Sequence, residues 1–217
     1  MKLKKGSFKL KTAGFKKEVG PGDPPAGTFA IARDRHLHVK NKKRLKAGIR
    51  KFVRPENCAE ITTLLPIENG ARIHAVVKGD FVICDLLLSI IKKLGPAELT
   101  VATLGLKAAN AVALADAKAA GLCKSVVVLV SHYFRGVEKS DQYAGILGVF
   151  EQANIPCKVA RTHAKVFLLS GEFGKYVIEG SANLRASGNI EQLTIFHCPD
   201  LYAFHKDWID EVMESAQ

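Results

Sequence analysis

The chain has 217 residues, of which 47% are hydrophobic and 24% are charged, so we expect one main folded domain and exclude disorder of the whole chain. Its net charge is +11, and residues 1–54 carry the whole excess, with 17 lysines and arginines against 3 acids. No apolar run reaches the length of a membrane span, and no hydrophobic segment follows the basic N-terminus, so we expect neither a transmembrane helix nor a secretory signal.

The basic segment 1–54 comes first along the chain. A cluster of proline and glycine at residues 19–25 prevents regular structure, so we expect a linker there and partial disorder of the segment. Its many cations repel one another unless a polyanion neutralises them, and nucleic acid does so with release of counterions. We therefore expect nucleic-acid contacts at Lys42, Lys43 and Arg44. A solvated tail and an anionic membrane surface are the alternatives.

Strands and helices alternate from residue 72 onwards. Hydrophobic patterns predict strands over 72–77, 99–104 and 124–130, and helices over 80–94, 107–120 and 140–154. Strands over 157–170, 175–180 and 191–197 follow, and then an amphipathic helix over 199–213. This order indicates an α/β fold in which helices flank a mixed β-sheet, and we assign residues 55–217 to that domain.

The five cysteines are widely spaced, and most of them lie in apolar runs: Cys58, Cys84, Cys123, Cys157 and Cys198. A zinc site needs paired ligands at short spacing, which this pattern lacks. We therefore expect reduced core cysteines in a cytoplasmic protein, with no metal site and no cofactor.

The predicted strands 157–170 and 175–180 carry a group of polar residues. Residues two apart in a strand point to the same face, so His163 and Lys165 project together. Ser181 and Asn183 do the same if the second strand extends through them. The loop 171–174 lets the two strands pair as a hairpin. An imidazole, an ammonium, a hydroxyl and a carboxamide then meet on one patch, which suits a phosphate diester: donors for its oxygens and a nucleophile for its phosphorus.

This group resembles the signature of the phospholipase D superfamily, which is His-x-Lys, then an Asp, then Gly-Ser-x-Asn. The resemblance includes the downstream Asn-x-Glu of the nuclease members, and the matching residues are His163, Lys165, Gly180, Ser181, Asn183, Asn189 and Glu191. The motif covers about thirty residues, and the β/α pattern extends the likeness from residue 72 to the C-terminus.

Two departures from the signature stand out. Ser170 occupies the position of the family Asp, which supports the family's site structurally, and the gap between Lys165 and Gly180 is longer than usual. The string His205-Lys206-Asp207 lacks the spacer residue and lies on the predicted terminal helix, so we do not assign it to the site.

The resemblance implies a role for each matching residue. His163 would attack phosphorus and form a phosphohistidine, while Lys165 and Asn183 hold the non-bridging oxygens. Ser181 would add a hydrogen bond, and Glu191 would accept from the other imidazole nitrogen and orient the ring. The lysine charge and the amide dipoles would stabilise the phosphoryl oxygens, as a metal cation does in other enzymes.

The mechanism also needs a second histidine, which protonates the leaving oxygen and later activates water. Family members with two motifs supply it from one chain, but this sequence has one motif only. We therefore expect a two-fold homodimer in which each chain contributes its His163.

These inferences lead to a metal-independent nuclease acting on DNA or RNA, with Asn189 and the basic residues 42–44 contacting the substrate. Two alternatives stay open. One is a phosphodiesterase for a lipid or another small diester at an anionic membrane. The other is a catalytically inactive nucleic-acid-binding protein, which the serine at position 170 favours.

Overall fold

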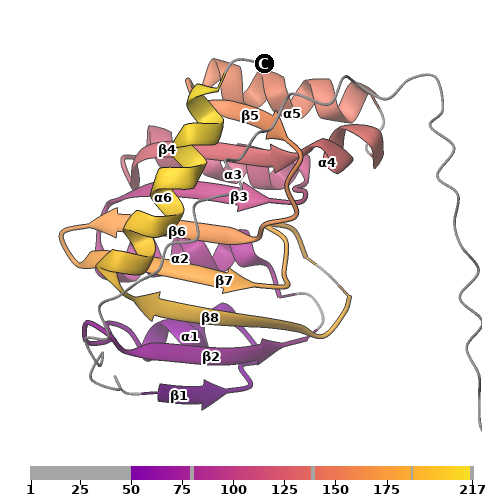
Figure 1. The fold of residues 1–217 in the computed structure, drawn as a ribbon. Helices are drawn as coiled ribbons and strands as arrows, with labels where there is room; N and C mark the ends of the chain where they lie inside the picture. The colour runs from indigo at the N-terminus through magenta and orange to yellow at the C-terminus, as the bar shows by residue number, and fades with distance from the viewer. Residues whose placement is uncertain (1–49, 79–80, 138–139, 187, 216–217) are drawn as a thin grey trace, which may run out of the picture. The chain divides into compact units, whose positions relative to one another are not determined.

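The computed structural model describes residues 50–78, 81–137, 140–186 and 188–215. Lys42, Lys43 and Arg44 lie outside these residues. In the described part of the chain, eight strands form one mixed sheet (Figure 1). In spatial order the strands are β1 (Arg50–Val53), β2 (Arg72–Val77), β8 (Glu191–His197), β7 (Gly174–Gly180), β6 (Val166–Gly171), β3 (Ala97–Thr103), β4 (Cys123–Ser131) and β5 (Cys157–Ala160).

The strand directions bring the carboxyl ends of most strands to one edge of the sheet. β1 and β2 are parallel to each other, as are β3, β4 and β5, whereas β8 and β6 are antiparallel to both of their neighbours. The carboxyl ends of β1, β2, β7, β3, β4 and β5 therefore meet the amino ends of β6 and β8. We call this the carboxyl edge of the sheet; it is where open α/β sheets usually bind ligands.

Helices cover the two faces of the sheet unequally. One face packs a large apolar core with α1 (Cys58–Thr63), α2 (Ile83–Leu94), α3 (Ala108–Ala119), α4 (His132–Val137) and α5 (Ser140–Gln152). The other face carries α6 (Pro199–Glu214), which crosses the sheet in Figure 1 and packs on β6 and β7. Among the described residues, no helix combines the length and apolar character needed to cross a membrane.

The helix boundaries follow from local chemistry. α2 buries an apolar stripe that includes Leu86, Leu87 and Ile90, and it ends before Gly95, whose φ of 119° favours glycine. Gly121, with φ of 72°, follows α3 as the sequence predicts. α6 begins at Pro199, which is suited to the first turn because its missing N–H has no helical partner there.

The α/β class with a mixed sheet flanked by helices is confirmed, and β2 and β8 have the predicted bounds. The helix predicted over 80–94 begins later, at Ile83. The single strand predicted over 157–170 is wrong. It is two strands, because β5 lies at the sheet's edge and β6 in its middle, with β3 and β4 between them. The connection 161–165 must cross the carboxyl edge, so it leaves the sheet.

Three elements were not predicted: β1, α1 and α4. β1 belongs to the segment 1–54 by sequence, so the sheet begins before the predicted domain boundary at residue 55. Its side chains are mostly exposed, as expected for an edge strand, and its arginine and lysine residues conceal it within the basic segment. The five cysteines are free, and burial raises the pKa of Cys84 to about 12.

Candidate active site

The five predicted site residues lie together at the carboxyl edge. His163 and Lys165 directly precede β6, Ser181 and Asn183 follow β7, and Glu191 begins β8. These three strands are neighbours, with Val166 opposite Glu179 and Gly180 opposite Leu193. The topology therefore brings residues from three segments of the chain to one place.

His163 and Lys165 contact each other directly, although neither is in a strand. The Lys165 Nζ atom lies 3.0 Å from His163 Nδ1 and donates to the His163 carbonyl oxygen at 3.1 Å. Burial lowers the pKa of the Lys165 ammonium, and the nearby Glu191 carboxylate opposes that shift. The His163 side chain is exposed, which leaves it accessible to a substrate.

Ser181 joins the ends of β7 and β8. Its hydroxyl donates to Glu191 Oε2 and accepts from the Gln192 N–H at 3.1 Å, while its own N–H donates to the Gln192 carbonyl at 3.0 Å. The hydrogen bond predicted between His163 and Glu191 is therefore not formed between these two described residues. In its place, Glu191 binds Ser181, and Lys165 occupies the Nδ1 side of the imidazole.

Gly180 has a steric reason to be glycine. A Cβ atom at this position would meet the Gln192 carbonyl oxygen and come within 2.9 Å of the Leu193 Cα. β7 and β8 approach each other closely at this point, so any larger residue would push them apart. The glycine of the Gly-Ser-x-Asn string therefore has a packing role, which is separate from any chemical role of the serine and the asparagine.

Asn183 points into a pocket beside these residues. The pocket has a volume of about 330 Å³ and is lined by Lys107, Asn183, Arg185, Ala186, Asn189 and Glu191. The Asn183 Oδ1 atom is buried and has no hydrogen-bond partner among the described residues, which is uncommon because most buried polar atoms are satisfied. A carboxamide offers both an acceptor and two donors, so a polar ligand can satisfy it.

Lys107 and Arg185 are pocket residues that the sequence analysis missed. Lys107 precedes α3, whose amino end favours anions, and Arg185 follows Asn183 by two positions. The available signal was position: Lys107 comes just after β3, and loops at the carboxyl ends of strands commonly form ligand sites. The two cations and the pocket's amide groups suit an anionic ligand.

Ser170 lies away from the site. It stands near the far end of β6, five residues and about 16 Å along the strand from Lys165. Its side chain faces the buried Tyr202 of α6, where it opposes the rise in the Tyr202 pKa that burial causes. The family's acidic position therefore contacts the terminal helix in this protein, and a serine there removes no group from the site.

His205 is on α6, as predicted, and has a structural environment. Its Nε2 atom lies 2.5 Å from Glu179 Oε1, and its Nδ1 atom accepts from the Trp208 indole at 3.0 Å. The side chain is buried against the sheet. The string His205-Lys206-Asp207 therefore connects α6 to β7 and is not part of the candidate site.

No protein-family model and no curated protein matches the sequence. Among solved structures, a polyphosphate kinase from Porphyromonas gingivalis superposes with a TM-score of 0.50 at 14% sequence identity. The match covers 67% of this chain and 26% of the kinase, so the chain spans about a quarter of that protein's length. At this identity the likeness shows the fold alone.

Proposed function

We propose that this protein is a metal-independent phosphodiesterase, and specifically a nuclease that cleaves DNA or RNA as a homodimer. The observation that carries the proposal is the convergence of an imidazole, an ammonium, a hydroxyl, a carboxamide and a carboxylate at the carboxyl edge, beside a pocket with two further cations. The fold likeness to a protein named polyphosphate kinase supports phosphoryl-transfer chemistry in general.

His163 would attack phosphorus through Nε2. The Lys165 Nζ atom lies 3.0 Å from Nδ1. A protonated lysine can only donate there, so it would place the ring proton on Nε2, where the proton blocks attack. Binding of a phosphate would draw the ammonium onto a non-bridging oxygen. The Nδ1 atom could then carry the proton and donate to a carboxylate, and Glu191 is the nearby candidate. Substrate binding would thus switch the imidazole into its nucleophilic tautomer.

The covalent steps balance without a metal ion. A bond forms between Nε2 and phosphorus as the bond to the leaving oxygen breaks, and a second imidazole gives that oxygen its proton. Water then attacks the phosphohistidine, loses a proton to the second imidazole and releases His163. Lys165 and Asn183 would stabilise the charge that develops on the phosphoryl oxygens.

The second imidazole would be the partner subunit's His163. Among the other described histidines, His74, His197 and His205 each have a hydrogen-bond partner: Thr194, the Ile67 carbonyl and Glu179, respectively. His132 begins α4 after β4, and β3 separates β4 from β6. A two-fold axis beside the exposed His163 would place two copies of the same imidazole across one phosphate.

A cleavage panel in EDTA tests the proposal. Labelled single- and double-stranded DNA and RNA, together with bis(p-nitrophenyl) phosphate as a generic diester, are incubated with wild type and with His163→Ala. We expect cleavage of at least one nucleic acid by wild type and a loss of about a thousandfold or more in the variant. His132→Ala, at an exposed histidine that begins α4, is the matched control and should retain activity.

Wild-type protein that leaves every nucleic acid intact would contradict the nuclease assignment. Turnover of the generic diester alone would support a small-diester phosphodiesterase. Binding of nucleic acid that survives His163→Ala, with no activity to lose, would identify the catalytically inactive alternative, which the occupied Nδ1 atom of His163 favours.

A further inference from the structure

The face of the sheet that carries α6 is only partly covered by that helix. α6 packs on β6 and β7, whereas β1, β2 and β8 extend beyond it (Figure 1). Side chains along each strand point alternately to the two faces of the sheet. The register of β1, β2 and β8 places the side chains that point to the uncovered face next to one another. We call this surface the β1–β2–β8 face; it consists of Arg50, Phe52, Arg54, Arg72, His74, Val76, Gln192, Thr194 and Phe196.

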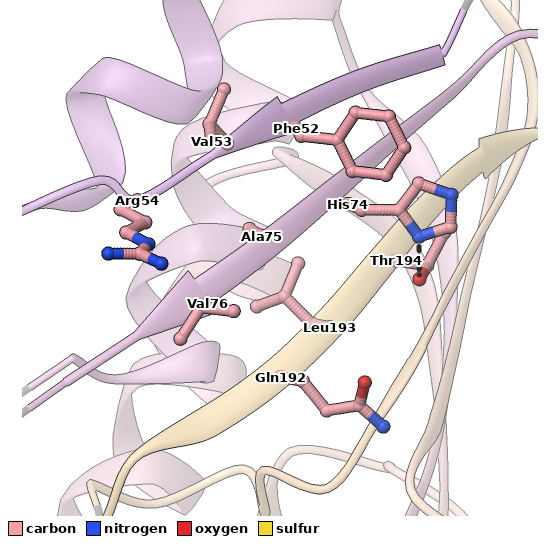
Figure 2. A pocket seen from close by; sticks show the side chains of 9 residues that line it. All are labelled: Phe52, Val53, Arg54, His74, Ala75, Val76, Gln192, Leu193 and Thr194. Atoms are coloured by element: carbon pink, nitrogen blue, oxygen red, sulfur yellow. Dashed lines mark hydrogen bonds between the residues drawn. The ribbon is translucent and has the colours of Figure 1, made fainter.

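An aromatic pair lies at the centre of this face. The Phe52 and His74 rings stack with centroids 5.2 Å apart and an interplanar angle of 13°. Figure 2 shows them side by side, with His74 Nδ1 joined to Thr194 Oγ1 at 3.0 Å. The hydrogen bond holds the imidazole in place, yet Phe52 remains 76% exposed. A large apolar ring is thus held open to solvent.

Every charged side chain of the face is an arginine, whereas on the neighbouring strand β7 Glu179 lies opposite Thr194 and pairs with His205. Arg50, Arg54 and Arg72 belong to the face, and none of its side chains is acidic. The pKa of the His74 imidazole is lowered mainly by burial, and the charges of Arg72 and Arg50 add to this shift. The groove beside the pair, lined by Phe52, Arg54 and their neighbours, has a volume of about 470 Å³.

We propose that the β1–β2–β8 face binds single-stranded nucleic acid, with an unpaired base stacked on Phe52 and phosphates held by the three arginines. Stacking on aromatic rings combined with a cationic groove is the usual way in which proteins hold single strands. A paired base has its faces covered by its neighbours in the helix and cannot use the ring. The surface therefore favours single strands over duplexes.

Charge argues against two other occupants. The chain's own residues 1–49 are strongly basic, so the arginines would repel them. A second copy docked face to face by a two-fold axis would set arginines against arginines. An anionic membrane is the remaining competitor, and the experiment below separates it from nucleic acid.

The face leads towards the candidate active site. Gln192 belongs to the face, and its backbone N–H donates to Ser181. The residue that precedes it in β8 is Glu191. From Thr194 to Glu191 the distance along the strand is about 10 Å. This step rests on the proposed nuclease function: a strand bound on the face would continue into the site a few nucleotides away.

Fluorescence anisotropy with short labelled oligothymidylate and oligouridylate tests the binding claim in the His163→Ala protein, so that cleavage plays no part. We expect Phe52→Ala to weaken binding about tenfold, and Phe52→Tyr to retain it. In the double variant Arg50→Ala with Arg72→Ala, the slope of log K against log[salt] should become less steep by about 1.4, because two phosphate contacts are lost.

Matched controls come from other surfaces. Phe204→Ala removes an exposed phenylalanine of α6, and Lys92→Ala with Lys93→Ala removes two exposed cations at the end of α2. Circular dichroism and thermal melting establish that each variant is folded. Phe52→Ala binding as tightly as Phe204→Ala, or duplex binding as tight as single-strand binding, would overturn the proposal.

Vesicles of phosphatidylserine and phosphatidylcholine form the second arm. Loss of vesicle binding in Phe52→Ala with unchanged oligonucleotide binding would identify a membrane surface and also overturn the proposal. The nuclease assignment is judged separately: wild type that binds single strands through Phe52 without cleaving them leaves this surface established and the catalytic proposal refuted.

Discussion

The Lys165 Nζ atom contacts His163 Nδ1, and in the proposed mechanism it would also bind a phosphate oxygen of the substrate. A protonated lysine at Nδ1 holds the imidazole in the tautomer that cannot attack through Nε2. The same ammonium is the charge that a phosphate would attract. In the proposed mechanism, Lys165 would therefore couple substrate binding to activation of His163.

The pH dependence of cleavage tests this coupling. Burial lowers the pKa of Lys165, so its charge is lost at a lower pH than that of a free lysine. If the ammonium holds the phosphate, kcat/KM should fall on the alkaline side, below the ordinary lysine value of 10.5. Lys165→Arg keeps its charge and should remove this alkaline limb while it lowers the maximal rate.

The control for that profile is Lys124→Arg, at an exposed lysine of β4. It should leave both the rate and the alkaline limb unchanged. An alkaline limb that persists in Lys165→Arg would assign the titration to another group.

At the scale of elements, the junction of β7 and β8 positions half of the site. Gly180→Ala should destabilise the protein by about 2 kcal/mol, because the added methyl group would meet the backbone of β8. Urea unfolding measures the change. Gly188→Ala, where the added atom meets nothing within 4 Å, should be nearly neutral. Equal stability of the two variants would show that β8 yields without cost.

The contact between β6 and α6 explains the missing acid of the motif. The Ser170 side chain interacts with Tyr202, and Ser170 lies opposite Glu98 of β3. Restoring the family residue with Ser170→Asp should therefore not raise the cleavage rate. It should lower the melting temperature, because a carboxylate would replace a half-buried hydroxyl beside Tyr202, and the repulsion from Glu98 on β3 would offset the attraction of Lys175 on β7. A gain in kcat would contradict the assignment of this position to α6 packing.

For the whole molecule, the proposed mechanism needs a second imidazole, which a partner subunit would supply. Light scattering should give the mass of a dimer. Mixing wild type with His163→Ala at constant total protein should give mixed dimers that hold one imidazole and are inactive, so activity should fall with the square of the wild-type fraction. An excess of Lys92→Ala with Lys93→Ala, which keeps its His163, should not inhibit. A linear decline with His163→Ala would indicate that each chain acts alone.

The local patterns in the sequence were sufficient to predict the α/β class, most of the helices and the strands that became β2 and β8. Apolar periodicity carries that information because each element must bury one face. The same patterns missed β1, whose exposed cations resemble a solvated tail, and they joined β5 to β6. Strand order is set by packing between distant segments, which no local pattern contains.

The site shows the same division. Residue types and spacing singled out His163, Lys165, Ser181 and Asn183 as one group, and the resemblance to the phospholipase D signature added Glu191. Only the tertiary structure decided their partners: Lys165 against the imidazole, Ser181 against Glu191, and Ser170 against α6. It also brought Lys107 and Arg185 into the pocket and Phe52 onto His74. Hydrogen bonds and stacking depend on distances across the sheet, and those distances exist only once the strands have paired.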